Sequence, residues 1–128
     1  MPQHAETMLG DVAGSPMTPT TTGVEIPNKA SRRRIDFNEY GFCRVQWADS
    51  QGAGVTGLRI EYSLDDGTNW GEMCPTVIGV GGPYDNDCGD WVPLPPDVQN
   101  APYNVLCRAM VTGTGVSTKV TYVTIQLR

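Results

Sequence analysis

Four segments of the chain alternate apolar and polar residues with a period of two, and this pattern limits the fold more than any other feature. They are LRIEYSL at 58–64, FCRVQWA at 42–48, NVLCRAMVT at 104–112 and TKVTYVTIQLR at 118–128. Successive side chains of a β-strand point to opposite faces of its sheet. Each segment is therefore predicted to be a strand with one buried face.

Glycine and proline separate these segments: the 128 residues include 15 Gly and 10 Pro, together 25/128 or about 20%, against roughly 12% in average proteins. Shorter candidate strands lie at 33–38, 70–73, 76–80 and 90–94. Seven or eight short strands without a strong helix signal predict an all-β fold, an antiparallel two-sheet sandwich of either the jelly-roll or the immunoglobulin-like kind. The last two long strands are expected to pair as a hairpin through the turn at 113–117.

Residues 1–30 differ from the rest of the chain. They hold four prolines and the run TPTTT, and they show neither helical nor strand periodicity. We expect an extended N-terminal arm at 1–30, followed by a β-sandwich domain at 31–128. Such an arm is either a disordered tail or a segment that becomes ordered along a neighbouring subunit. In the second case its apolar anchors would be Met8, Leu9, Val12, Met17, Val24 and Ile26.

The net charge of −5 is unevenly distributed. Between Arg59 and Arg108 there are eight acidic residues and no basic one, so this stretch should repel nucleic acid. The triplet Arg32, Arg33 and Arg34 is a solvated hinge at the start of a strand, a contact with an acidic protein surface or a phosphate contact, and a single triplet beside an acidic domain is a weak nucleic-acid signal. No apolar run approaches the roughly 18 residues of a membrane span, and the N-terminus lacks the basic start and apolar run of a secretory signal. Neither a nucleic acid nor a membrane is an expected partner.

The sequence has four cysteines, at positions 43, 74, 88 and 107. No two of them form a C-x-x-C motif, so a zinc site is not expected. Cys74 and Cys88 flank a loop rich in glycine, proline and aspartate, which a cross-link would restrain. A Cys74–Cys88 disulfide is therefore one prediction. The alternative is that all four cysteines are small buried hydrophobic residues with free thiols.

No catalytic machinery is visible in the sequence. The one histidine, His4, lies in the N-terminal arm, and there is no G-x-S-x-G motif to mark a nucleophile. Acidic loop residues are abundant, but their spacing favours no particular carboxylate pair. The prediction is a protein that is not an enzyme, with no catalytic residues, no metal site and no cofactor.

The string SLDDGTNW at 63–70 resembles the Asp-box, a hairpin turn found in sialidases and in many other secreted or viral β proteins. Asp65 can accept hydrogen bonds from backbone N–H groups of the turn, Gly67 can adopt positive φ, and Trp70 can fold back over the hairpin. The resemblance implies a structural hairpin built on Ser63, Asp65, Gly67 and Trp70, and it implies no glycosidase activity.

Residues 33–128 resemble a set of small β-sandwich proteins of phage virions. The resemblance is carried by RRIDFNEYGFCRVQWADSQGAGVTGLRIEYSLDDGTNW at 33–70 and by the ending VTYVTIQLR at 120–128. It implies a capsid decoration (cement) protein, often a homotrimer, on the outer surface of a phage head assembled in the host cytoplasm. The implied partners are the major capsid protein and further copies of this chain.

Two alternatives remain open from the sequence. A tail, fibre or neck protein of the virion would share the fold and differ in location. A carbohydrate-binding sandwich would use exposed aromatic rings to bind a glycan, and the candidates near the acidic loops are Trp70, Tyr84, Trp91 and Tyr103.

Overall fold

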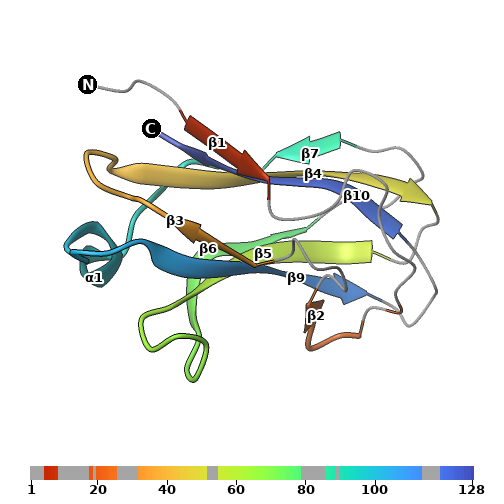
Figure 1. The fold of residues 1–128 in the computed structure, drawn as a ribbon. Helices are drawn as coiled ribbons and strands as arrows, with labels where there is room; N and C mark the ends of the chain where they lie inside the picture. Colours follow the sequence, from red (N-terminus) through yellow and green to blue (C-terminus); the bar gives the residue numbers. More distant parts are fainter. Residues whose placement is uncertain are drawn as a thin grey trace.

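The computed structural model describes residues 5–8, 18, 20–25, 32–51, 55–78, 86–88, 90–113 and 119–128. Its elements, in chain order, are β1 (Ala5–Met8), β2 (Val24–Glu25), β3 (Arg32–Ile35), β4 (Phe42–Gln51), β5 (Val55–Ser63), β6 (Gly71–Ile78), β7 (Asn86–Cys88), β8 (Val92–Pro93), α1 (Pro96–Gln99), β9 (Val105–Gly113) and β10 (Lys119–Leu127) (Figure 1).

The strands form two antiparallel sheets that lie one above the other (Figure 1). In the first sheet the order is β1-β10-β4-β7, and β8 also pairs with β4. In the second sheet the order is β2-β9-β5-β6, and β3 also pairs with β9. The prediction of an all-β, antiparallel two-sheet sandwich is confirmed.

The strand order identifies the sandwich as a jelly roll. If β2 with β3 and β7 with β8 are each counted as one interrupted strand, the eight resulting strands have the orders 1-8-3-6 and 2-7-4-5. In an immunoglobulin-like sandwich the last two strands would be neighbours in one sheet. Here β9 pairs with β5, whereas β10 pairs with β4 in the other sheet. The predicted hairpin between these two strands is therefore wrong.

The core fills the space between the sheets and follows the predicted alternation. In β9, for example, Val105, Cys107, Ala109 and Val111 are at most 1% exposed. The buried residues of the core are Ile35, Phe37, Cys43, Val45, Leu58, Ile60, Met73, Cys74, Leu94, Val98, Val105, Cys107, Ala109, Val111, Val123, Ile125 and Leu127.

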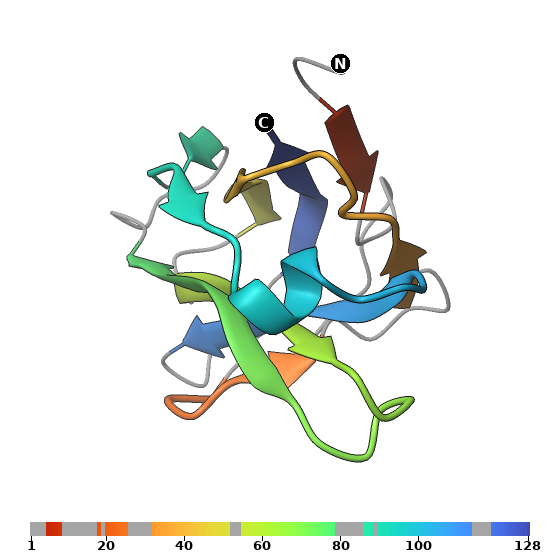
Figure 2. The same ribbon diagram turned by 90° about the vertical axis from the view of Figure 1, so that its left-hand side faces the viewer.

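A single helical turn, α1, lies at one end of the sandwich between the two sheets (Figure 2). Pro96 starts the turn, which suits proline because the first helical residue needs no N–H partner. Val98 is 1% exposed and extends the core at this end of the sandwich. The proline-rich stretch that follows β8 thus closes one end of the core.

Two parts of the predicted N-terminal arm belong to the sheets. In β1, Ala5 pairs with Leu127 of β10, and in β2, Val24 pairs with Val111 of β9. The predicted boundary at residue 30 therefore does not separate these strands from the sandwich. A strand such as β1 gains its hydrogen bonds from the edge of an existing sheet, so it needs no apolar periodicity of its own.

Candidate interaction surface

The loop between β5 and β6 is closed by hydrogen bonds among its own residues. Ser63 Oγ donates to Asp65 Oδ1 at 2.7 Å and accepts from the Gly67 N–H at 2.8 Å. Asp65 accepts from Asn69 twice, from its backbone N–H at 2.8 Å and from its side-chain amide at 2.6 Å. Trp70 Nε1 donates to the Gly67 carbonyl at 3.1 Å, and Gly67 has a φ of +91°. The polar groups of the turn are thus largely used within the turn.

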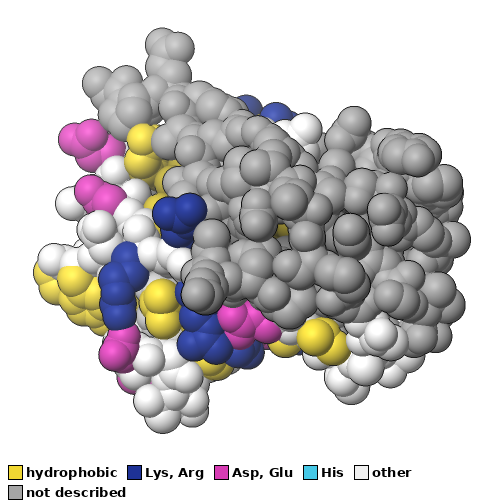
Figure 3. All heavy atoms as spheres, turned by 45° about the vertical axis from the view of Figure 1, so that its right-hand side comes forward, with side chains coloured by type: hydrophobic (Ala, Val, Ile, Leu, Met, Phe, Trp, Pro, Cys, Tyr) yellow, Lys and Arg dark blue, Asp and Glu magenta, His cyan; other side chains and the backbone are white. Residues whose placement is uncertain are grey.

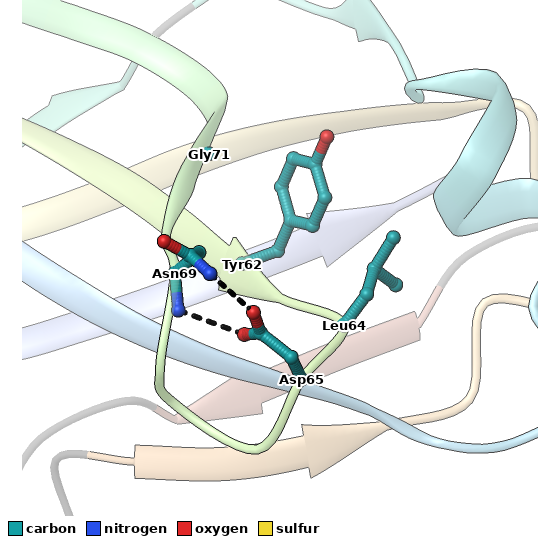
Figure 4. A pocket seen from close by; sticks show the side chains of 5 residues that line it. All are labelled: Tyr62, Leu64, Asp65, Asn69 and Gly71. Carbon is teal, nitrogen blue, oxygen red and sulfur yellow. Dashed lines mark hydrogen bonds between the residues drawn. The ribbon is translucent and has the colours of Figure 1, made fainter.

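Hydrogen bonds from Asn69 and Ser63 lower the pKa of Asp65 to about 2. The carboxylate lies beside a shallow hollow of about 290 Å³ lined by Tyr62, Leu64, Asp65, Asn69 and Gly71. Figure 4 shows the two Asp65–Asn69 hydrogen bonds on one side of this hollow and the side chains of Tyr62 and Leu64 on the other. Because the acid is already bonded within the turn, it has little capacity left for a ligand.

The outer face of the second sheet carries a network of arginine and glutamate side chains. Glu61 on β5 accepts from Arg59 at 3.0 Å and from Arg108 at 2.7 Å. Glu25 on β2 accepts from Arg32 at 2.8 Å and from Arg108 at 3.4 Å. Basic and acidic side chains also lie next to one another at the lower left of the face shown in Figure 3. The network joins four strands of the sheet, β2, β3, β5 and β9, and neutralises much of their charge.

Trp70 completes this network. The guanidinium of Arg108 lies 4.0 Å from the ring centroid, and that of Arg32 lies 5.1 Å from it. Such cation–π contacts contribute roughly 0.5–1 kcal/mol each at exposed sites. The ring of Trp70, a candidate for glycan binding, is therefore covered by arginines of its own chain.

The arginine triplet lies on β3 and is exposed. Arg32 bonds Glu25, and Arg34 is ion-paired with Asp66 in the β5–β6 loop. Arg33 pairs in register with Cys107, an inward-facing residue, so it lies on the core-facing side of the strand although it is exposed. A charge in this position discourages another strand from adding to the edge. The triplet is thus part of the sheet edge and is not a hinge outside the fold.

A second aromatic and cationic cluster lies on the first sheet. Trp91, just before β8, lies 4.5 Å from the guanidinium of Arg44 and 4.6 Å from that of Arg128, measured to its ring centroid. Arg128 also lies 5.7 Å from the Phe42 ring, and Phe42 is 43% exposed. We call Phe42, Arg44, Trp91 and Arg128 the Trp91 patch. It presents an exposed aromatic ring and two cations together.

Two polar residues next to the Trp91 patch, on the outer side of β10, are buried. Gln126 is 5% exposed and bonds Arg44 at 2.6 Å and Gln46 at 2.7 Å. Thr124 is 1% exposed, and its hydroxyl oxygen has no hydrogen-bond partner among the residues that the structure describes. These bonds fix Arg44 against the sheet, so the cation that contacts Trp91 is already in place.

The structure describes only some of the predicted apolar contact residues. Val24 is half-buried and packs against the core of its own chain. Met8 lies in β1, and its side chain is outside the described residues. Four further predicted anchors, together with the glycan candidate Tyr84, also lie outside the described residues: Leu9, Val12, Met17 and Ile26.

The three cysteines whose side chains the structure describes have free thiols. Cys43, Cys74 and Cys107 are all buried, and Cys74 Sγ lies 3.2 Å from Cys43 Sγ. The predicted Cys74–Cys88 disulfide is therefore not formed, and the neighbour of Cys74 is a cysteine from the other sheet. The side chain of Cys88 is outside the described residues.

Sequence reasoning missed Phe42, Arg44 and Arg128 as a group. The period-two pattern does place Phe42 and Arg44 on the outer side of their strand, opposite Cys43. Arg128 joins them because its backbone is hydrogen-bonded to that of Phe42. The N–H of each residue donates to the carbonyl of the other at 3.0 Å. This pairing depends on topology, which alternation does not reveal.

Among the described residues, no three His, Cys, Asp or Glu side chains form a group that could hold a metal ion. No helix in the described part of the chain is long and apolar enough to cross a membrane. No protein-family model, curated protein or solved structure matches this chain.

Proposed function

We propose that this protein is a non-enzymatic structural protein of a phage virion, namely a capsid decoration (cement) protein. It binds the major capsid protein and copies of itself, as a homotrimer, on the outer surface of the head. The resemblance of residues 33–128 to small virion β-sandwich proteins motivates the proposal. The structural observation that supports it best is the Trp91 patch.

The fold is compatible with this role. Jelly rolls occur in viral capsid domains and also in lectins, so the fold alone selects neither function. What distinguishes the two roles is the surface that makes contact. A protein partner needs an exposed area of aromatic and cationic side chains, whereas a sugar needs an accessible aromatic face with free polar groups around it.

The Trp91 patch has the composition of a protein interface. Aromatic residues and arginine are enriched in such interfaces and dominate their binding energy. The two guanidiniums that flank Trp91 hold its ring in one position, so little side-chain freedom is lost on binding. The exposed ring of Phe42 supplies apolar area beside them. The partner surface should therefore combine an apolar recess with carboxylates that receive Arg44 and Arg128.

The aromatic side chains that could bind a glycan are largely engaged within the chain itself. Trp70 and Trp91 each lie against two arginines of the chain. The Tyr103 hydroxyl donates to the Leu64 carbonyl at 3.2 Å. The Tyr62 hydroxyl donates to Asp97 at 3.2 Å. These internal bonds support the choice of a protein partner over a sugar.

Electron cryo-microscopy of virions of the phage that encodes the protein tests the proposal. Density that fits the two-sheet sandwich at three-fold positions on the outer head surface is the expected result. The same density on the tail, fibre or neck would replace decoration by the nearest alternative. Its absence from the particle, together with binding to a glycan array, would overturn the virion role.

A further inference from the structure

Two buried cysteines from different sheets face each other across the core. Cys43 lies on β4 of the first sheet and Cys74 lies on β6 of the second sheet. Their Sγ atoms are 3.2 Å apart, and the two residues are 0% and 2% exposed. No backbone hydrogen bond joins β4 to β6, because these strands belong to different sheets.

We propose that Cys43 and Cys74 form an intramolecular disulfide that links the two sheets when the protein equilibrates with a low-molecular-weight disulfide such as oxidised glutathione. A disulfide bond has an S–S length of about 2.05 Å, so the sulfurs must approach by roughly 1.2 Å. Small changes of side-chain rotation can supply such a shift. This pairing replaces the Cys74–Cys88 disulfide that the sequence suggested.

The reaction has two exchange steps. One cysteine thiolate attacks glutathione disulfide, which forms a protein–glutathione mixed disulfide and releases one glutathione thiolate. The second cysteine thiolate then attacks the mixed disulfide, which forms the Cys43–Cys74 bond and releases the second glutathione. The protein loses two electrons and two protons, and one glutathione disulfide becomes two molecules of reduced glutathione.

Burial controls the rate of this reaction. The contact with Cys43 and the loss of solvent both raise the pKa of the Cys74 thiol far above its usual value. Because the thiolate is the attacking species, exchange in the folded protein should be slow and should require local opening of the end of the sandwich. Refolding in a glutathione buffer removes this barrier, since the thiols are then accessible before the core forms.

The bond should stabilise the fold because it closes a loop between strands that no hydrogen bond connects. The two cysteines are 31 positions apart in the sequence, and a cross-link across a loop of this size removes a large part of the unfolded chain's conformational freedom. The expected rise of Tm is about 10 °C for a domain of this length. A reductant added at the same temperature should reverse it.

Peptide mapping of the full-length chain tests the pairing. After refolding in reduced and oxidised glutathione, the protein is alkylated and cut with trypsin and with a protease that cleaves before aspartate. Trypsin alone leaves three cysteines on the peptide 60–108, whereas the double digest places each cysteine on its own peptide: 36–44, 66–84, 87–89 and 97–108. The expected product is 36–44 joined to 66–84.

A different product would overturn the proposal. Linkage of 66–84 to 87–89 would restore the Cys74–Cys88 pairing, and four fully alkylated peptides would show that no bond forms. As a matched control, Cys107→Ala removes a third buried thiol and should keep both the linked peptide and the reductant-sensitive rise of Tm. Cys43→Ala should abolish both. If Cys43→Ala does not fold, the peptide map of the unsubstituted protein still shows which two cysteines are linked.

Discussion

Arg108 on β9 and Glu61 on β5 form the most buried ion pair of the second sheet's outer face, with Nη2 2.7 Å and Nε 2.8 Å from the same carboxylate oxygen. The other oxygen of Glu61 accepts from Arg59 at 3.0 Å. The side chain of Glu61 is only 13% exposed. One carboxylate therefore binds two guanidinium groups at the same time. Without it, the two positive charges would repel each other.

We expect Glu61→Gln to lower the free energy of unfolding by about 1–3 kcal/mol, because two partly buried cations lose their shared counter-charge. Urea denaturation measures the change. Asp90→Asn alters an exposed carboxylate elsewhere and should stay within about 0.5 kcal/mol of the unchanged protein. Equal effects of the two substitutions would mean that the network contributes nothing to stability.

The depressed pKa of Asp65, about 2, predicts a pH dependence of stability. An unfolded aspartate has a pKa of about 3.9, so the folded state favours the ionised carboxylate. This contribution is complete above about pH 4 and is lost as the pH falls towards 2. NMR titration of the Asp65 carboxyl carbon should give a midpoint near 2, and a midpoint near 3.9 would contradict the hydrogen bonding of the turn.

The matching variant is Asp65→Asn. Between pH 4 and 2 its Tm should fall less steeply than that of the unchanged protein, because the titrating group has been removed. Asp90→Asn keeps Asp65 and should retain the steeper fall.

The buried Thr124 hydroxyl, which has no hydrogen-bond partner in the described part of the chain, predicts a stabilising substitution. Thr124→Val keeps the branched shape and removes a polar group that was taken out of water without compensation. The free energy of unfolding should rise by about 1 kcal/mol, measured by urea denaturation. Thr18→Val, at an exposed position, should change it by less than about 0.5 kcal/mol. A loss of stability in Thr124→Val would show that the hydroxyl is hydrogen-bonded in solution.

The proposed head contact predicts that Phe42→Ser weakens binding to phage heads that lack this protein by about 5- to 30-fold, which corresponds to roughly 1–2 kcal/mol. Sedimentation of the protein with heads measures the bound fraction. Because Phe42 is 43% exposed, the substitution should leave Tm nearly unchanged.

Tyr103→Ser is the matched control for this experiment. Tyr103 is also an exposed aromatic residue, at 51%, but its hydroxyl bonds the Leu64 carbonyl in the β5–β6 loop of the second sheet, away from the Trp91 patch. It should bind heads as the unchanged protein does. If Tyr103→Ser loses binding and Phe42→Ser does not, the contact surface lies at the hairpin and the Trp91 patch has another role.

Alternation in the sequence predicted most of the core-facing side chains. It predicted neither the burial of Thr124 and Gln126 on the outer side of β10 nor which strands are neighbours. Val123 and Ile125 lie in the core as expected, because burial depends on local spacing. The pairing of β10 with β4 joins Ile125 to Val45, residues that are distant in the sequence. A short polar loop can close a hairpin or cross to the opposite sheet, and its composition is the same in both cases.

The cysteines illustrate the same limit. Loop composition suggested Cys88 as the partner of Cys74, because the two are close in sequence. The fold instead places Cys74 opposite Cys43, since β4 and β6 face each other across the core. The Asp-box pattern was more informative: the positive φ of Gly67 and the Asp65–Asn69 bonds depend only on neighbouring residues.

The pairing of β1 with β10 sets Ala5 opposite Leu127, so the first and last strands run side by side at one margin of the sandwich. Figure 1 shows the start of β1 and the end of β10 at the same corner of the molecule. Peptides joined to the start of β1 and to the end of β10 would therefore leave the sheet next to each other, so two different cargoes could be displayed side by side.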